Sequence, residues 1–154
     1  MDKSLSIDHQ LRATWQAVAK LYNERAAKFD STMATAFVLL NIDVEKGIPS
    51  TALGPSMGME PTSLSRILKA IEAKGAIVRE KNPDDGRSVI IKLTEYGRKM
   101  RAFSRTSVII FNEKIREHIT EEELDAFFKV MSTINKLINE KLIFDENNID
   151  LKAV

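Results

Sequence analysis

The apolar residues of this sequence leave helical spacing at one place only, directly after Gly75. Elsewhere they recur every three or four residues, which is the period of a helix, but here they follow the two-residue period of a strand. Two such runs, 76–81 and 88–93, flank a Pro-Asp-Asp-Gly turn at 83–86. Because proline, aspartate and glycine favour tight turns, the pattern predicts one β-hairpin within a chain that is otherwise helical.

Helical spacing on either side of the hairpin predicts six helices. Pro61 suits a first helical position, where a missing N–H costs nothing, and Gly75 suits the position just after a helix end. The Thr-Glu-Glu-Glu sequence at Thr120 is a capping box, which satisfies the first backbone N–H groups of a helix. The expected helices are 7–29, 32–44, 50–57, 61–74, one that begins after Thr94 and one that begins after Thr120, before an acidic tail from Asp145 that we expect to fray.

The composition excludes several classes of protein. The chain of 154 residues has no cysteine, which excludes disulfides, thiolate zinc sites and sensing through thiols. The N-terminal sequence lacks the apolar segment of a signal peptide, and no apolar run approaches the roughly 20 residues of a membrane span. We therefore expect a cytoplasmic protein that does not enter a membrane.

Charge is unevenly distributed, although the net charge of the whole chain is only +1. Eleven basic and six acidic residues lie between Glu60 and Arg105, which gives this stretch a net charge of +5. From Thr106 onward six basic and ten acidic residues give −4, and the first 59 residues balance. A basic centre of this kind is typical of a nucleic-acid-binding surface, and a solvated surface of mixed charge is the alternative.

Two short helices followed by a hairpin is the order of elements in a winged helix-turn-helix. The expected fold class is therefore mainly α with a small β-hairpin wing, flanked by long N- and C-terminal dimerisation helices. The terminal helices carry more apolar surface than the central module can cover, which predicts a symmetric dimer. Within a single integrated domain, we expect residues 1–30 and 106–154 to form the dimerisation region and residues 31–105 the DNA-binding region. A monomeric bundle is the alternative.

The second short helix, residues 61–74, is the expected recognition helix. Its inward face is apolar, whereas its outward face carries small hydroxyls and two cations. Hydroxyls can contact phosphates or base edges, and arginine can pair with guanine O6 and N7 in the major groove. Serine and threonine are also common at helix starts, so an ordinary helix N-terminus is the alternative. The candidate DNA contacts are Thr62, Ser63, Ser65, Arg66 and Lys69.

The hairpin, with its wing at residues 81–93, supplies a second candidate contact with DNA. A hairpin beside a recognition helix can reach the adjacent minor groove, where arginine senses groove width and negative potential. Arg87 lies just past the turn, and Asp85 is placed to pair with its guanidinium and set its direction. The alternative is that Asp85 and Arg87 only hold the turn together.

The sequence from Ser65 to Gly97, SRILKAIEAKGAIVREKNPDDGRSVIIKLTEYG, resembles the multiple antibiotic resistance regulator (MarR) family of bacterial winged-helix repressors. The matching features are the Ser-Arg of the helix, the Lys-Gly-x-Ile-x-Arg run, the Asp-x-Arg at Asp85 and Arg87, and the Leu-Thr-x-x-Gly that follows. With the long terminal helices, the resemblance extends over nearly the whole chain. It implies an obligate homodimer, a pseudo-palindromic operator in double-stranded DNA, repression relieved by a ligand, and wing contact through Arg87.

Two departures from the family pattern precede the recognition helix. Gly54 and Pro55 fall within the first helix of the motif, where proline should bend or shorten it. Glu60 stands at the N-cap where a hydroxyl is more usual, and a carboxylate there points unfavourably toward phosphate. These departures concern the individual contacts of the recognition helix and leave the expected mode of binding unchanged.

The residues give little support to functions other than DNA binding. The only histidines, His9 and His118, belong to no catalytic or metal-binding constellation, so we expect neither an enzyme nor a bound metal or cofactor. Gly54 and Gly58 lack the rest of a phosphate-binding loop. The main alternative is a winged-helix module that binds other proteins without binding DNA, and the net charge of +5 argues against it.

The resemblance also implies a site for a small lipophilic or aromatic acid where the dimer helices meet the DNA-binding region. Arg12 or Lys20 could bind the carboxylate of such an effector. For each candidate, plain core or solvated surface is the alternative. The candidate ligand-binding residues are Arg12, Trp15, Tyr22, Phe37, Met100 and Phe103.

Overall fold

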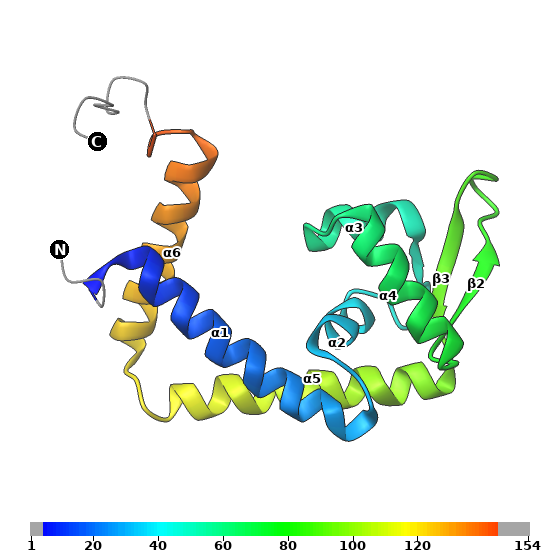
Figure 1. The fold of residues 1–154 in the computed structure, drawn as a ribbon, viewed down its shortest axis with the longest axis horizontal. Coiled ribbons are helices and arrows are strands. Elements are labelled where there is room, and N and C mark those ends of the chain that lie inside the picture. Colours follow the sequence, from blue (N-terminus) through cyan, green and yellow to red (C-terminus); the bar gives the residue numbers. More distant parts are fainter. Residues whose placement is uncertain (1–4, 145–154) are drawn as a thin grey trace. The chain divides into compact units, whose positions relative to one another are not determined.

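The computed structural model describes residues 5–144, and Figure 1 shows the order of the elements along the chain. The chain divides into two compact units, residues 1–109 and 110–154, with the boundary inside helix α5. The elements of the first unit are α1 (Ile7–Ala26), η2 (Ala27–Phe29), α2 (Met33–Leu40), β1 (Ile48–Pro49), α3 (Ser50–Met57), α4 (Pro61–Ala73), β2 (Ile77–Lys81), β3 (Val89–Leu93) and most of α5 (Glu95–Arg116). The end of α5 and helix α6 (Glu121–Asn139) belong to the second unit.

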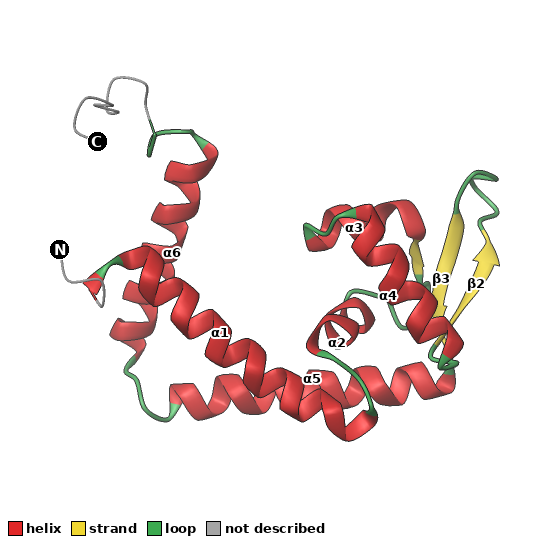
Figure 2. Cartoon of the chain, viewed as in Figure 1, coloured by secondary structure: helices red, strands yellow, loops and turns green. Residues whose placement is uncertain are grey.

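One sheet of three antiparallel strands, in the order β1-β3-β2, lies beside α4 in the first unit (Figure 2). Strands β2 and β3 pair from Ile77 with Leu93 to Lys81 with Val89, and they form the predicted hairpin. Helices make up most of the rest of the described chain. The expected fold class, mainly α with a small β-hairpin wing, is confirmed.

The second helix is shorter than the sequence predicts. Helix α2 ends at Leu40, and Val44 lies in the turn that follows instead of on the helix. The carboxylate of Asp43 accepts hydrogen bonds from the backbone N–H groups of Glu45 and Lys46, at 2.9 and 2.6 Å. Such a local turn offers the backbone an alternative to helical hydrogen bonds, and this explains the early end of the helix.

A third strand, β1, lies outside the predicted hairpin. Gly47 has φ +71°, and a Cβ at this position would overlap the backbone carbonyl oxygen of Ile91, so only glycine lets the chain pass this close to β3. Ile48 then pairs with Ile91, and Pro49 pairs with Ile90. A strand of two residues leaves no periodic signal in a sequence, and the prediction therefore missed it.

The hydrophobic core of the first unit lies between α2, α3, α4, the sheet and the start of α5. Burying one large aliphatic side chain contributes about 1.5–3 kcal/mol, so this core holds α4 and the hairpin on one body. The largest fully buried side chains are Val38, Leu39, Ile42, Leu53, Ile71, Ile77 and Ile91.

Helix α4 begins where the sequence predicts and ends one residue earlier than predicted. Pro61 occupies its first position, and the helix ends at Ala73. Gly75 has φ +72°, and the N–H of Ala76 donates to the carbonyl oxygen of Ile71 at 2.9 Å. This is a Schellman arrangement, in which glycine supplies the left-handed conformation that reverses the chain after a helix.

Threonine side chains cap both α5 and α6, where the sequence predicts that these helices begin. The hydroxyl of Thr94 accepts the N–H of Gly97 at 3.0 Å and donates to the carbonyl oxygen of Gly75 at 2.6 Å. The start of α5 is thereby fastened to the end of α4. Thr120 and Glu123 exchange side-chain to backbone hydrogen bonds of 3.2 and 2.8 Å, and these form the capping box of α6.

Helix α6 leaves much of its apolar face exposed within the described part of the second unit. None of its 19 residues is buried, and the side chains of Phe127 and Phe128 are 53% and 55% exposed. Their rings lie 5.5 Å apart in an edge-to-face arrangement. A contiguous uncovered apolar surface of this kind marks an interaction site in a stable protein. The tail from Asp145, which the sequence predicts to fray, lies outside the described residues.

Candidate nucleic-acid interface and effector cavity

Helix α4 presents one face to the core and the opposite face to solvent. Leu64, Leu68 and Ile71 are buried, which fixes the rotation of the helix about its axis. All five candidate DNA-contacting residues of α4 are exposed as a result. Four of them line a shallow surface groove together with Pro61, and Ser63 does not. The four residues are Thr62, Ser65, Arg66 and Lys69.

Ion pairs divide the cations of this basic region into two groups. Arg79 in β2 pairs with Glu72 in α4 at 3.0 Å, and Lys92 in β3 pairs with a carboxylate of β2 at 2.6 Å. Arg66, Lys69 and Arg87 are exposed and form no ion pair within residues 5–144. A cation without a carboxylate partner needs no internal bond to be broken before it meets a phosphate. All three cations predicted to contact DNA belong to the unpaired group, which also contains Lys81, Arg101 and Arg105.

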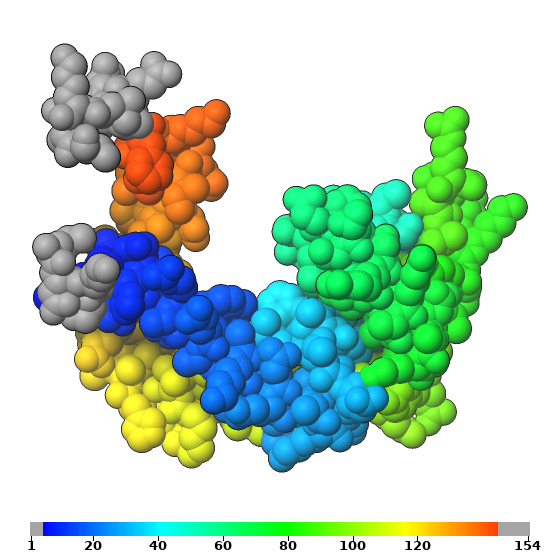
Figure 3. All heavy atoms as spheres, in the orientation of Figure 1, coloured from blue at the N-terminus to red at the C-terminus, as the bar shows by residue number. Residues whose placement is uncertain are grey.

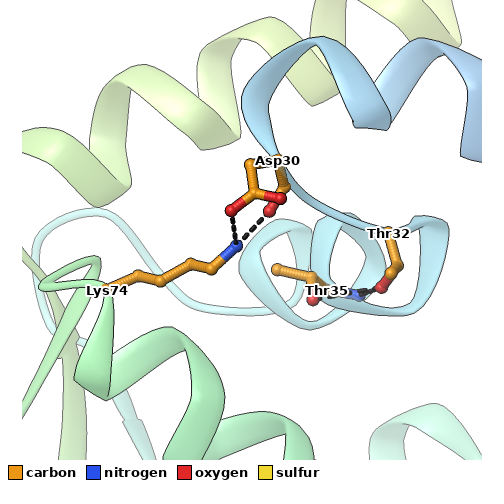
Figure 4. Close-up of polar contacts among 4 residues, drawn as sticks. All are labelled: Asp30, Thr32, Thr35 and Lys74. Carbon is orange, nitrogen blue, oxygen red and sulfur yellow. Dashed lines mark hydrogen bonds and ion pairs between the residues drawn. The ribbon is translucent and has the colours of Figure 1, made fainter.

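Lys74, just after the end of α4, has a structural contact that its sequence position does not reveal. Its Nζ atom donates to the backbone carbonyl oxygen of Asp30 and lies 3.1 Å from Oδ2 of the same residue (Figure 4). Asp30 has φ +49° and lies in the turn between η2 and α2. Thr32 caps α2 beside it by accepting the N–H of Thr35 at 3.2 Å. Lys74 therefore connects the end of α4 to the turn that precedes α2.

The hairpin tip projects beyond the atoms around it in the space-filling view (Figure 3). Arg87 is exposed at this tip, and its backbone N–H donates to Oδ1 of Asp85 at 3.0 Å. The expected pairing of the Asp85 carboxylate with the Arg87 guanidinium is not present: the structure shows the backbone contact and no ion pair between the two side chains. Asp85 thus acts on the direction of Arg87 through the main chain.

The two departures from the family pattern lie at the crossing of α3 and α4. Pro55 is accommodated inside α3, which ends two residues later at Met57. A Cβ on Gly54 would lie 3.4 Å from Cδ2 of Leu64, so the small residue allows the two helices to approach closely. Glu60 is the exposed N-cap of α4, and its side chain makes no capping hydrogen bond.

A cavity of about 150 Å³ lies between α1, α2 and α5 in the first unit. Four of the six candidate ligand-binding residues line it: Trp15, Tyr22, Phe37 and Phe103. Arg12 does not line this cavity, and neither does Lys20, which pairs with Glu24 one turn away at 4.0 Å. Met100 does not line it either, because its side chain is packed into the core and only 4% exposed.

Arg25, which was not among the candidates from the sequence, is the cation that lines this cavity. Its Nε atom donates to the hydroxyl of Ser107 at 3.2 Å, and its guanidinium carbon lies 4.8 Å from the ring centre of Phe103. Arg25 forms no ion pair within the described residues. Burial raises the pKa of the Tyr22 hydroxyl above its usual value. The cavity thus combines aromatic walls with one positive charge and several hydroxyls.

Metal-binding clusters and membrane-spanning helices are both absent from residues 5–144. No group of three or more histidine and carboxylate side chains in this range is placed to hold a metal ion. None of the described helices is long and apolar enough to cross a membrane.

The chain is similar in sequence to known transcriptional regulators. The MarR family model matches residues 32–89, from the N-cap of α2 to the start of β3. The HTH-type transcriptional regulator SarZ of Staphylococcus saprophyticus subsp. saprophyticus is 29% identical over 124 residues, which cover 80% of this chain and 81% of SarZ.

Two solved structures are similar along most of the chain. The PcaV transcriptional regulator from Streptomyces coelicolor, in complex with its natural ligand, has a TM-score of 0.75 and 19% identity, covering 88% of this chain and 96% of PcaV. A mutant of MarR from E. coli, in complex with operator DNA, has a TM-score of 0.75 and 22% identity, covering 86% and 96% of the two chains. At these identities the likeness shows a shared fold.

Proposed function

The chain belongs to the MarR family of winged-helix transcriptional regulators, and we propose that it binds a pseudo-palindromic operator as a homodimer and represses transcription until a small molecule releases it. Helix α4 would enter the major groove, and the wing at 81–93 would reach the adjacent minor groove. It would act in the cytoplasm, by binding and not by catalysis. The dimerisation region would comprise residues 1–30 and 106–154, and the DNA-binding region residues 31–105.

The segregation of the cations carries the DNA-binding part of this proposal. Arg66 and Lys69 on α4 and Arg87 on the wing are exposed and unpaired, whereas Arg79 and Lys92 are held in ion pairs within the fold. The hydroxyls of the α4 groove would add hydrogen bonds to phosphates or base edges. One surface of one unit thus offers both a recognition helix and a wing with cations available to DNA.

The uncovered face of α6 supports the homodimer. A helix with no fully buried residue gains little packing energy within one chain, and its apolar residues need a second surface. A second copy of the same chain supplies such a surface by symmetry. Phe128→Asp would place a charge on this face, and we expect it to shift the chain toward monomer in analytical ultracentrifugation. Lys129→Asp, on the polar side of the same helix, should leave the dimer intact; a monomeric parent would contradict the proposal.

The cavity beside Arg25 supports a small lipophilic or aromatic acid as the releasing ligand. Aromatic walls provide apolar contact area, and the guanidinium offers charge-assisted hydrogen bonds to a carboxylate. The structure of the relative PcaV contains that protein's natural ligand, in keeping with ligand control in this fold.

The experiment that tests DNA binding is a titration of duplex DNA at several salt concentrations, after selection of a bound sequence from a random pool. Each phosphate neutralised by a lysine or arginine steepens the loss of affinity with salt, so we expect a strong salt dependence. A two-fold symmetric recovered sequence would support the dimer. Absence of binding, or binding without any salt dependence, would instead favour a winged-helix module for protein–protein contact.

A further inference from the structure

We propose that Asn82 and Ser88, two buried residues of the hairpin tip, are positioning residues that hold Arg87 in the direction needed for the minor groove. This inference rests on the proposed function of the wing in DNA binding. Neither residue was among the candidates from the sequence, and neither is expected to touch DNA itself. Their role is to make the tip rigid before DNA arrives.

The two side chains are buried although they lie on a projecting hairpin. Asn82 is 7% exposed and Ser88 is 6% exposed. They face each other directly beyond the last strand pair, Lys81 with Val89, and Nδ2 of Asn82 donates to the hydroxyl of Ser88 at 2.8 Å. Buried polar groups persist in folded proteins when they are paired with one another, as they are here. The pair therefore closes the base of the tip loop, residues 83–87.

Further hydrogen bonds extend from this pair around the loop. The side-chain carbonyl oxygen of Asn82 accepts the N–H of Asp84 at 3.0 Å. This arrangement favours a turn. The backbone carbonyl oxygen of Asp85 accepts the N–H of Ser88 at 3.1 Å and lies 3.4 Å from its hydroxyl. The hydroxyl of Ser88 can therefore accept from Asn82 and donate to Asp85 at the same time.

Arg87 is fixed by this network on both sides of its Cα atom. Its own N–H donates to the carboxylate of Asp85, and the N–H of the next residue, Ser88, donates to the backbone carbonyl oxygen of Asp85. The peptide groups before and after Arg87 are both anchored as a result, and the anchored main chain sets the direction of the Arg87 side chain. The guanidinium itself remains free for DNA within the described structure.

The tip needs such a network because it has no apolar core of its own. In a flexible loop, each side chain that becomes ordered on binding lowers the affinity, whereas a loop held in its bound conformation avoids that cost. Supporting hydrogen bonds around a contacting residue are the usual means of holding it within the narrow range of productive geometry. The network would thus raise affinity without adding a contact to DNA.

The test is a double-mutant cycle in the full-length chain, with the duplex recovered by random-pool selection as the probe. We expect Asn82→Ala and Ser88→Ala each to weaken binding about fivefold when measured at a temperature where both variants are fully folded. Each should also lower the melting temperature by a few degrees, because the remaining partner is left buried without its hydrogen bond. In an Arg87→Ala background the same substitutions should have no further effect, because their influence passes through Arg87. Ser88→Thr keeps the hydroxyl and should restore most of the affinity.

Salt dependence separates positioning from direct contact. Arg87→Ala should reduce the slope of log affinity against log salt by about one, because one cation is lost. Asn82→Ala should leave that slope unchanged. Two outcomes would overturn this inference alone. One is that Asn82→Ala lowers DNA affinity equally whether Arg87 is present or replaced by alanine. The other is that Asn82→Ala leaves the affinity unchanged when Arg87 is present. A parent protein that binds no DNA would overturn the proposed function together with it.

The contribution of Asp85 can be isolated with two substitutions of equal charge. Asp85→Ala and Asp85→Asn both remove the carboxylate, which by itself strengthens attraction to phosphate. Only asparagine keeps an oxygen that can accept the N–H of Arg87. We therefore expect Asp85→Asn to bind at least severalfold more tightly than Asp85→Ala, and equal affinities would overturn the anchoring through the main chain.

Discussion

Arg25 in α1 donates a hydrogen bond of 3.2 Å from its Nε atom to the hydroxyl of Ser107 in α5, which lies 82 positions later in the sequence. This contact joins two walls of the cavity and holds the guanidinium against the ring of Phe103. The hydroxyl of Ser107 is itself oriented by donation to the carbonyl oxygen of Phe103 at 2.9 Å. The positive charge of the cavity is therefore fixed in place before any ligand enters.

Arg25→Leu is expected to weaken the binding of aromatic acids about tenfold or more, because a charge-assisted hydrogen bond is lost. A panel of substituted benzoates and phenylalkanoic acids, screened by the rise in melting temperature, provides the measurement. Arg12→Leu is the matched control, since Arg12 is on the same helix but does not line the cavity. Equal losses of affinity for the acids in the two variants would show that the positive charge acts at long range. Arg25 would then make no specific contact with the ligand.

Arg87→Ala is expected to weaken DNA binding without lowering the melting temperature, because the side chain is exposed and forms no bond within the fold. Lys99→Ala removes an exposed cation that is already paired with Glu95 at 3.0 Å, and it should have a much smaller effect. Fluorescence anisotropy with the selected duplex measures both variants. If Arg87→Ala binds the duplex as well as the parent does, the wing does not contact DNA through Arg87.

Glu60→Ser is expected to improve both the stability and the DNA affinity of the protein. The N-cap of α4 has no side-chain hydrogen bond, and a serine there typically adds about 1 kcal/mol of stability. Removal of an acid near the DNA-facing end of α4 should also reduce repulsion from phosphate. Glu60→Gln separates the two effects, since it removes the charge without supplying a hydroxyl. We expect Glu60→Gln to raise affinity in the DNA titration with little change in melting temperature.

Gly97→Ala is expected to destabilise the fold by about 3 kcal/mol, as overpacked core substitutions do. Alanine normally favours the interior of a helix over glycine by about 1 kcal/mol, so the sequence alone predicts the opposite sign. In α5, however, a Cβ on Gly97 would overlap the backbone carbonyl oxygen of Ala76. Gly86→Ala is the control, because a Cβ there meets nothing within 4 Å. Thermal unfolding of the two variants should differ clearly, and equal melting temperatures would contradict the close approach.

Features governed by local rules could be predicted from the sequence. Pro61 at a helix start, Gly75 after a helix end and the capping box at Thr120 each depend on neighbours within a few residues. The hairpin was predicted for the same reason, since its turn and its alternating strands are contiguous. The rotation of α4 about its own axis could also be predicted from the sequence, because its buried leucines and isoleucine repeat at helical spacing.

Features that depend on distant contacts could not be predicted in this way. The sequence places Arg12 and Arg25 on one long helix, but only the crossing of α2 and α5 decides which of them lines the cavity. Strand β1 exists because Gly47 allows a close approach to β3, some 40 residues later. The buried pair of Asn82 and Ser88 reads as ordinary turn composition until the two strands are in register.

The hydrogen bonds of the hairpin tip all begin and end between Asn82 and Ser88, while the strand ladder below them is set by β2 and β3. A change of sequence inside this loop that keeps its length and turn therefore need not alter the pairing of the two strands. In evolutionary terms, if the wing reads the minor groove as proposed, the tip is an exchangeable module whose groove preference can diverge while the recognition helix and the core stay constant. Regulators with new operators could arise from this fold by replacement of a seven-residue segment alone.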